Sequence, residues 1–402
     1  MKTICVLKNP IQKYAWGSHT FLAELMGRPS PTQEPEAELW MGAHSKAPST
    51  VETVDKAESL LDLIARCPQD ILGEKTAAAY NCRLPYLFKV LALGRALSIQ
   101  AHPNLDQARK GFQKENRQGL PLDAADRNYR DDNHKPELIS ALTPFWALNG
   151  FREIPDMLLC LKKVCSVALK HEIRELEQTS DGPGLKGFIA RLLTMEIEAV
   201  REVLAEALFR AEKGQSQNPI FKWMVRLHET YPGDIGVLFP AILNLVRLEP
   251  GQAMYLPAGQ FHAYLDGMGI ELMANSDNVL RGGLTPKHVD VPALLDVLEF
   301  KEQPLEIIEP QLGQACEKVY HTPAREFELS VIEPSSGKPY VSAAERSAEI
   351  LLVTSGKVVV SDDAAGGTTF TLSRGMSAVV PAAVESCRIS GNGTVYKAAI
   401  PS

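Results

Sequence analysis

GQAMYLPAGQFH, residues 251–262, is the stretch that decides how the fold of this chain is interpreted. It places a glycine, five residues and a proline ahead of Gly259 and His262. GMSAVVPAAVES, residues 375–386, repeats the first glycine and the proline at the same spacing, with Ala383 and Ser386 at the two later positions. Both stretches are typical of a strand, a tight turn and a second strand. The alternative is a chance likeness between two turns of a β-rich chain.

The first of these stretches resembles the cupin motif Gly-x5-Pro-x-Gly-x2-His, in which a turn presents a histidine into a β-barrel. Asp266 stands where that family has an asparagine. The resemblance implies two cupin-like jelly-roll barrels, of which only the first keeps a metal-binding histidine.

Hydrophobic periodicity divides the chain further. Segments after residue 150 carry apolar side chains at helical spacing, including one stripe over 189–204, and strand patterns return near residue 242. We therefore expect a mainly β chain with an α-helical insertion. The expected domains are a catalytic jelly roll in two parts (1–149 and 236–322), a helical domain (150–235) and a C-terminal degenerate jelly roll without a metal site (323–402).

The bulk composition excludes several classes of function. The 402 residues carry a net charge of -7, which argues against a nucleic-acid or anionic-membrane partner. No secretory leader and no apolar run of membrane-spanning length are evident. The seven cysteines are scattered without a Cys-x-x-Cys pair, as in a reducing compartment. We expect a cytoplasmic protein, a monomer, with no membrane partner and no cysteine-built metal site.

Three places hold side chains suited to a metal. In LSIQAHPN (97–104), Gln100 and His102 share one strand face. In YRDDNHKPEL (129–138), a polar loop leads into a buried strand at Glu137, and His262 ends the cupin-like turn. Two imidazoles, one carboxylate and one amide oxygen suit Zn²⁺, with Mn²⁺, Fe²⁺ and Co²⁺ as alternatives. A buried polar network without metal is the competing interpretation.

Residues 262–287 add further polar groups that could act on a ligand. Glu271, Asp277, Arg281 and Lys287 lie within seventeen residues, and Lys135, Arg281 and Lys287 could form a cationic patch for a phosphate. Thr285-Pro286 has the composition of a helix start. The competing interpretation is an ordinary solvated loop.

Two long stretches carry a second resemblance. YRDDNHKPE (129–137) and HAYLDGMGIELMANSDNVLRGGLTPK (262–287) are similar to the two signatures of type I mannose-6-phosphate isomerases; Gly282 replaces the usual alanine. KYAWGS (13–18) and AELWMGAHSKAPS (37–49) also resemble the start of that family. The resemblance implies one zinc ion per chain, held by Gln100, His102, Glu137 and His262. It also implies a catalytic arginine at Arg281 and active-site groups at His134, Lys135 and Asp277, with Lys89 as a weaker candidate.

The implied reaction interconverts mannose 6-phosphate and fructose 6-phosphate through a cis-enediol, with a base that moves a proton between C2 and C1. Lys135 and His134 are both candidates for that base, and the sequence does not choose between them. Trp16, Lys89, Glu271 and Lys287 are expected to bind the sugar phosphate. Two rival functions stay open, a cupin oxygenase with a redox metal and a sugar-phosphate sensor that has lost its chemistry.

Overall fold

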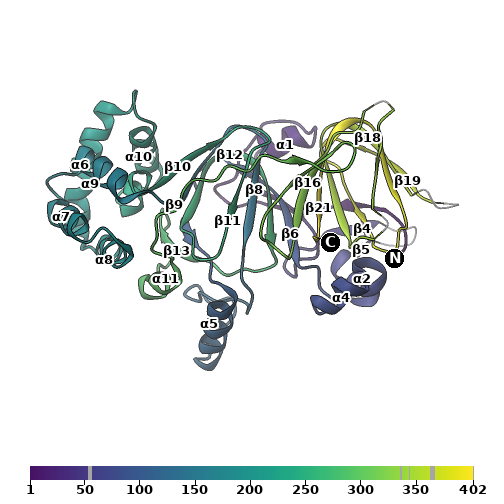
Figure 1. Cartoon of the computed structure of the whole chain (residues 1–402), viewed down its shortest axis with the longest axis horizontal. Helices are drawn as coiled ribbons and strands as arrows, with labels where there is room; N and C mark the ends of the chain where they lie inside the picture. The colour runs from purple at the N-terminus through teal and green to yellow at the C-terminus, as the bar shows by residue number, and fades with distance from the viewer. Residues whose placement is uncertain (53–56, 336, 344, 363–366, 402) are drawn as a thin grey trace.

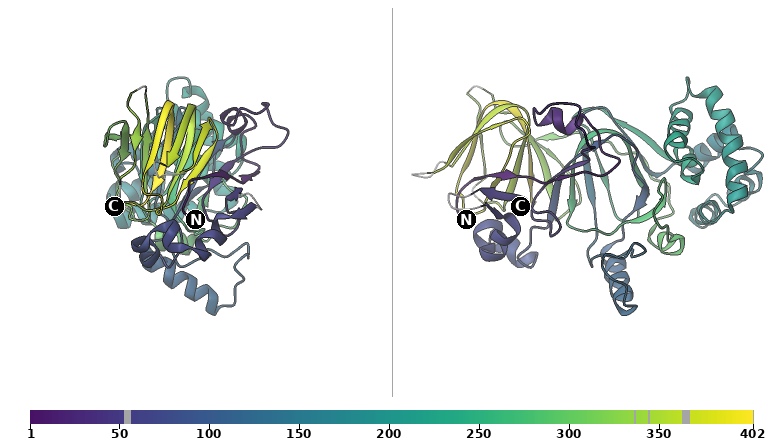
Figure 2. Two further views of the ribbon diagram at one scale, coloured as in Figure 1. Left: turned by 90° about the vertical axis from the view of Figure 1, so that its right-hand side faces the viewer. Right: turned by 180° about the vertical axis from the view of Figure 1, so that it is seen from behind.

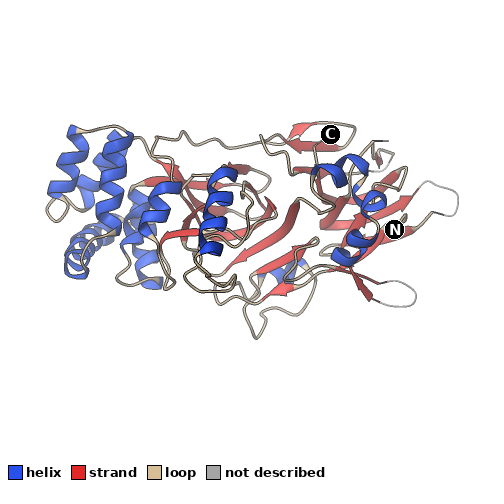
Figure 3. Cartoon of the chain, turned by 90° about the horizontal axis from the view of Figure 1, so that it is seen from below, coloured by secondary structure: helices blue, strands red, loops and turns tan. Residues whose placement is uncertain are grey.

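The molecule is elongated, with helices at one end and β-sheet over the rest of its length (Figure 1). A computed structural model describes residues 1–52, 57–335, 337–343, 345–362 and 367–401. Figure 3 shows the helices of the insertion gathered together beyond the sheet region. The expectation of a mainly β chain with helices is confirmed.

The middle of the molecule is one system of antiparallel strands that comes from both halves of the chain. These strands are β2 (Ile11–Gln12), β3 (Glu38–Met41), β6 (Tyr86–Leu93), β7 (Ile99–Ala101), β8 (Glu137–Ala141), β9 (Phe145–Phe151), β10 (Leu243–Leu248), β11 (Ala253–Leu256), β12 (His262–Ala274) and β13 (Leu280–Gly283).

Strand β12 joins the two layers of this system. Its first residues pair with β7 and β9, and its later residues pair with β6 and β8. The register shifts between Tyr264 and Asp266, and Gly267 follows with φ +117°, where a Cβ would lie 2.7 Å from the Pro144 carbonyl oxygen. Such a bulge and glycine let one strand bend from one layer into the other. The two ends of β12 therefore reach opposite walls of one interior.

Strand β6 is buried along its whole length because it is covered on both faces. Phe88, Val90 and Ala92 pack against the C-terminal sheet, whereas Leu91 and Leu93 fill the interior beneath β12. The exception is Lys89, a buried lysine on the interior face. A charge in that position requires ionic partners.

The helices of the insertion lie between β9 and β10 in the chain, and their apolar faces share one core with the β7–β13 edge. They are α6 (Ile154–Val164), α7 (Lys170–Gln178), α8 (Gly182–Leu193), α9 (Ile197–Gly214) and α10 (Pro219–Thr230), followed by the 3₁₀ helix η1 (Ile235–Ala241). The expected single stripe over 189–204 is wrong. Helix α8 ends at Leu193, α9 begins at Ile197, and Ile197 is exposed.

The other end of the molecule is a second sheet that also includes N-terminal strands (Figure 2, left). Its strands are β1 (Cys5–Lys8), β4 (Thr50–Glu52), β5 (Ala57–Ser59), β14 (Gln311–Leu312), β15 (Glu317–Tyr320), β16 (Glu328–Ile332), β17 (Tyr340–Val341), β18 (Glu349–Asp362), β19 (Thr369–Ser373), β20 (Ser377–Val380) and β21 (Cys387–Ala399). Residues 1–149 were expected to form the first part of the catalytic domain, whereas β1 pairs with β20 of this second sheet.

The sequence repeat corresponds to a repeated structural unit. In the first copy β11 leads through a turn into β12, and in the second copy β20 leads through a turn into β21. Strands β12 and β21 are each 13 residues long. Ser386, which replaces the histidine, directly precedes β21. The two copies therefore have the same strand–turn–strand arrangement and differ in the side chain at the end of the turn, which is His262 in the first copy and Ser386 in the second.

Further helices lie in the connections outside the insertion. They are α1 (Phe21–Leu25), α2 (Leu60–Arg66), α3 (Pro68–Leu72), α4 (Glu74–Ala79), α5 (Leu105–Arg117) and α11 (Val291–Val297). The expected helix start at Thr285-Pro286 is wrong. Helix α11 starts after Asp290, whose carboxylate accepts the amide N–H of Ala293 at 3.0 Å and so satisfies a free donor of the first turn. Within the described ranges, no helix combines the length and apolar composition needed to cross a membrane.

Candidate active site and metal centre

Strand register brings three candidate residues into one row. Gln100 on β7 lies opposite His262 on β12 and, on its other side, opposite Arg281 on β13. Directly paired residues of antiparallel neighbours point to the same face of the sheet. Gln100, His262 and Arg281 therefore face the same interior, although 162 and 181 positions separate the last two from the first.

His102 and Glu137 complete a compact cluster with His262. His102 follows β7 two residues after Gln100, and Glu137 opens β8. His102 Nε2 lies 3.2 Å from one Glu137 oxygen, and His262 Nε2 lies 3.5 Å from the other. Gln100 Nε2 is 3.5 Å from His262 Nε2. All three ionisable side chains are buried, with ligand atoms within 4.8 Å of one another.

The backbone fixes the orientation of both imidazoles. His102 Nδ1 lies 2.7 Å from the Asn278 carbonyl oxygen, and His262 Nδ1 lies 3.0 Å from that of Gln260. A carbonyl oxygen only accepts, so each Nδ1 carries the proton and each Nε2 offers a lone pair to the cluster. Among the described residues, the buried His102 Nε2 has no hydrogen-bond partner. An unpartnered buried nitrogen beside a carboxylate fits a metal ligand.

Burial and charge keep the cluster in its ligating form. Burial, assisted by the Lys135 ammonium, lowers the pKa of His102 to about 4, so its imidazole is neutral near pH 7. Although burial opposes ionisation of Glu137, the Lys135 ammonium holds the pKa of that carboxyl well below its usual range. The cluster thus presents a neutral His102 nitrogen and one carboxylate beside His262, and such nitrogen and carboxylate ligands are typical of zinc sites that also admit a substrate oxygen.

A second charged row lies on the opposite wall. Lys89 on β6 is opposite Glu271 on β12 and opposite Trp40 on β3. Its Nζ lies 3.0 Å from a Glu271 oxygen and 3.5 Å from one of Glu38. Burial opposes the charge on Lys89, but these carboxylates raise its pKa above the ordinary value. Burial raises the pKa of Glu271, and the nearby Glu137 carboxylate raises it further, although the Lys89 ammonium opposes the shift.

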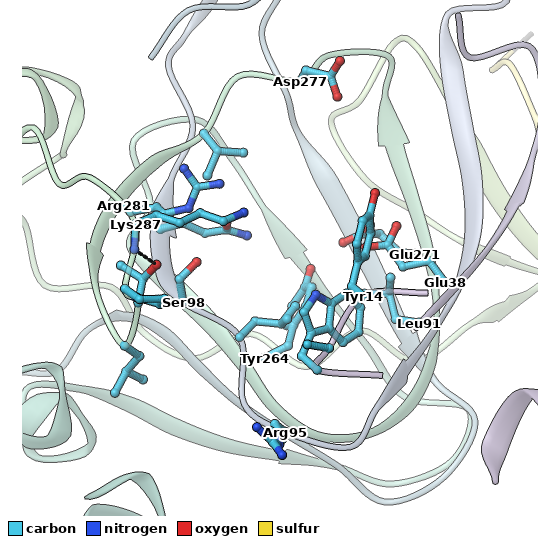
Figure 4. Close-up of a pocket in the computed structure, with 18 of the residues that line it drawn as sticks. Tyr14, Glu38, Leu91, Arg95, Ser98, Tyr264, Glu271, Asp277, Arg281 and Lys287 are labelled. Carbon is cyan, nitrogen blue, oxygen red and sulfur yellow. Dashed lines mark hydrogen bonds between the residues drawn. The ribbon is translucent and has the colours of Figure 1, made fainter. Parts of the chain in front are cut away.

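Gln100 and Arg281 of the first row line one cavity of about 1070 Å³ together with the second row. Figure 4 shows Glu38, Glu271 and Tyr14 on one side, and Ser98, Arg281 and Lys287 across from them. The expected site residues that line the cavity are Trp16, Lys89, Gln100, Lys135, Glu137, Glu271, Asp277, Arg281 and Lys287. His102 and His262 stand against Glu137 at the cavity wall.

The cationic side of the cavity has charges that no carboxylate neutralises. Within the part of the chain that the structure describes, neither Arg281 nor Lys287 forms an ion pair, and Arg130 also lines this wall. Burial and the Arg130 charge lower the pKa of Arg281, and burial with Arg281 lowers the pKa of Lys287. Cations held together without a counter-ion favour binding of an anion from solution.

Asp277 also lines this cavity and lies close to two basic side chains. Its Oδ2 lies 2.8 Å from Lys46 Nζ and 3.6 Å from His44 Nε2. Burial opposes ionisation, but Lys46 and His44 lower the pKa of the Asp277 carboxyl. Asp277 is therefore an anchored carboxylate in the cavity lining.

His134 is the one expected site residue that the structure does not bring to the cavity. Its Nε2 lies 2.7 Å from a Glu326 oxygen, next to strand β16, and its ring does not line the cavity. Pro136 extends the backbone here, so consecutive side chains point to opposite sides and Lys135 faces the cavity instead.

Sequence reasoning missed several residues of the site. They are Tyr14, Glu38, His44, Lys46, Arg95, Ser98, Arg130 and Tyr264. Ser98 shares its strand face with Gln100, so strand periodicity could have identified it. Arg130 and Tyr264 lie inside the two signature stretches, which could have identified them as site residues. Arg95 carries no signal in the sequence.

Comparisons with known proteins place these features in context. A family model described as the catalytic domain of type I phosphomannose isomerase matches residues 4–154. The chain is 40% identical to the mannose-6-phosphate isomerase of Salmonella typhimurium over 97% of this chain and 98% of that protein. It is 36% identical to the human enzyme of that name, over 88% of each chain. A crystal structure of mannose 6-phosphate isomerase bound with zinc and yttrium superposes with a TM-score of 0.92, at 39% identity and with both chains fully covered.

Proposed function

This chain belongs to the type I phosphomannose isomerase family, and from that membership we propose that it interconverts mannose 6-phosphate and fructose 6-phosphate. The observation that carries the proposal is the shared cavity. One wall holds the buried His102, Glu137 and His262 cluster, and another holds the unpaired cations Arg281 and Lys287. A sugar phosphate offers hydroxyl oxygens to the first wall and a phosphate to the second.

We propose that Gln100, His102, Glu137 and His262 hold one zinc ion per chain. The unpartnered His102 Nε2 and the mixed nitrogen and oxygen donors fit that ion. Solved relatives are described as zinc-bound mannose 6-phosphate isomerases. A zinc ion at this place would supply a Lewis acid that polarises the sugar oxygens at C1 and C2.

Lys135 is the proposed proton carrier. Of the two candidates that the sequence left open, it is the one that lines the cavity, with its Nζ 3.0 Å from Glu137. Its amine takes the proton from C2 of the open-chain aldose and returns it to C1, while a hydroxyl proton passes from O2 to O1. The product of the first transfer is a cis-enediol and that of the second is the ketose. Lys89 is less suited because two carboxylates hold its ammonium. The one carboxylate beside Lys135 is Glu137, which would bind the zinc ion instead and so leave Lys135 able to act as an amine.

The other walls position the substrate. Lys287 and the neighbouring cations would bind the phosphate, and Arg281 would stabilise negative charge on the enediol oxygens. Asp277 would take part in opening the sugar ring. Trp16 would pack against the sugar, with Lys89 and Glu271 hydrogen-bonded to its hydroxyls. His134 receives no role in proton transfer, because its ring contacts Glu326.

We also propose that the two sheet systems are two jelly rolls, joined to a helical domain over 150–235. The repeated strand–turn–strand unit supports this layout, and the pairing of β1 with β20 assigns the first strand to the C-terminal jelly roll. The 323–402 jelly roll has no metal site in this proposal, since Ser386 takes the histidine position. A monomeric state and a cytoplasmic location stay predictions.

The proposed function is tested by a coupled assay for fructose 6-phosphate. The zinc-loaded chain should convert mannose 6-phosphate without oxygen, lose turnover when a chelator removes the metal, and regain it when zinc returns. An anaerobic reaction excludes the oxygenase. Binding of mannose 6-phosphate by the zinc-loaded chain without turnover would refute the isomerase and favour the sensor.

A further inference from the structure

The two signature stretches meet at one carboxylate that lies outside the cavity. Asp131, in the 129–138 stretch, accepts four hydrogen bonds. Its Oδ1 accepts the Ser276 hydroxyl at 2.8 Å, the Asn133 amide N–H at 3.0 Å and the Asn278 side-chain amide at 3.2 Å. Its Oδ2 accepts the Asp277 amide N–H at 2.7 Å. Three of the four donors come from the consecutive residues 276–278.

Asn278 reinforces this junction from the other side. Its side chain is fully buried, and its Oδ1 accepts the Arg130 amide N–H at 2.7 Å. Its Nδ2 also donates to the carbonyl oxygens of Asp131 and Asn133, both at 2.9 Å. The segments around residues 131 and 277 are therefore held as one unit.

This unit positions two groups of the site. The carbonyl oxygen of Asn278 is the partner of His102 Nδ1 and so orients that imidazole. The second is the carboxylate of Asp277, which lines the cavity and whose own backbone N–H donates to Asp131. A displacement of 276–278 would turn the His102 ring and move the Asp277 carboxylate together.

We propose that Asp131 is a positioning residue that sets the His102 imidazole for the metal and the Asp277 carboxylate for the sugar. This inference rests on the proposed function. It extends the site to a group that touches neither ligand nor substrate. Groups that orient metal-binding histidines typically change metal affinity or activity by about 10- to 100-fold when they are removed.

Asp131→Asn is the sharpest variant. The amide oxygen keeps the three hydrogen bonds of Oδ1, whereas the new NH₂ opposes the Asp277 N–H donor at the Oδ2 position. Asp132→Asn is the matched control. It makes the same change one residue away, at an exposed side chain for which no hydrogen bond or ion pair occurs among the described residues.

The zinc dissociation constant is measured on metal-free protein by competition with a chromophoric chelator, alongside thermal unfolding of the metal-free chain and turnover at saturating zinc. Asp131→Asn should weaken zinc binding by about 10- to 100-fold and lower kcat, and Asp132→Asn should match wild type within about twofold. A lower unfolding temperature with unchanged zinc affinity and kcat would show a merely structural role and overturn the proposal.

Ser276→Ala keeps the test decisive if Asp131→Asn does not fold, because it removes only one of the four donors. It should weaken zinc binding measurably, and wild-type affinity in that variant would overturn the proposal. Failure of the wild-type chain to bind zinc would overturn both the proposed function and this role. Normal binding by wild type and by Asp131→Asn, with equal kcat, would overturn the role of Asp131 alone.

Discussion

Gln100 lies between neighbours of different chemistry, His262 on β12 and Arg281 on β13. The imidazole belongs to the compact cluster with Glu137, whereas the guanidinium extends along the cationic wall without an acidic partner among the described residues. A neutral amide at Gln100 leaves the cluster with a single negative charge from Glu137. In the proposed function, the residue row therefore divides into two groups that would hold the metal and one group that would meet the substrate.

Variants on the two sides of Gln100 should separate these roles. His262→Ala removes a ligand nitrogen, so the purified protein should lose its zinc and its turnover together. Arg281→Ala should keep about one zinc per chain and lose about 10²- to 10³-fold in kcat, the usual effect of removing one donor to a developing oxyanion. Metal analysis and the coupled assay on the same preparations measure both. An Arg281→Ala protein with wild-type kcat would contradict the assigned role.

The turn between β11 and β12 is the element that delivers His262. Gly259 has φ +76°, and a Cβ there would lie 3.0 Å from the Val297 carbonyl oxygen and 2.9 Å from the Glu299 side chain. Its amide N–H also donates to the His102 carbonyl at 2.8 Å, so the turn is tied to the other histidine segment. In the second copy of the repeat Ala383 takes this place, and its backbone does not have a positive φ.

Gly259→Ala should destabilise the chain by about 1–3 kcal/mol from backbone strain, with a further cost from the close contacts. Gly251→Ala is the control, since Gly251 has φ +90° but no atom within 4 Å of a Cβ. Gly259→Ala should therefore lower the thermal unfolding midpoint and the zinc affinity more than Gly251→Ala does. Equal effects of the two changes on both quantities would show that the packing of this turn is unimportant for the site.

Elements were predictable from sequence where the signal is local. Helix α10 starts at such a signal, Asn218 followed by Pro219, and the Asn218 side chain accepts the Ile220 amide N–H. The break between α8 and α9 was missed because apolar spacing continues across it. At 285–290 the Thr-Pro pair resembled a helix start, but Asp290 and Pro292 start α11 instead. Local composition alone does not show which of two possible N-cap residues starts the helix.

At the scale of the whole molecule, the site depends on pairings between distant parts of the chain. The strand face shared by Gln100 and His102 follows from period-two geometry, but their meeting with Glu137 and His262 depends on strand register. The two signature resemblances supplied that set where spacing could not.

The C-terminal sheet, which lacks the histidine, holds a buried ionic network instead. Lys397 Nζ lies 2.6 Å from a Glu317 carboxylate oxygen and 3.6 Å from one of Glu349.

Anomalous X-ray diffraction at the zinc absorption edge, on crystals of the zinc-loaded chain, would locate the metal directly. We expect one strong peak per chain, about 2.0–2.2 Å from the Nε2 atoms of His102 and His262 and from a Glu137 carboxylate oxygen. A zinc-loaded and active chain whose peak lies elsewhere, with this cluster empty, would contradict this expectation.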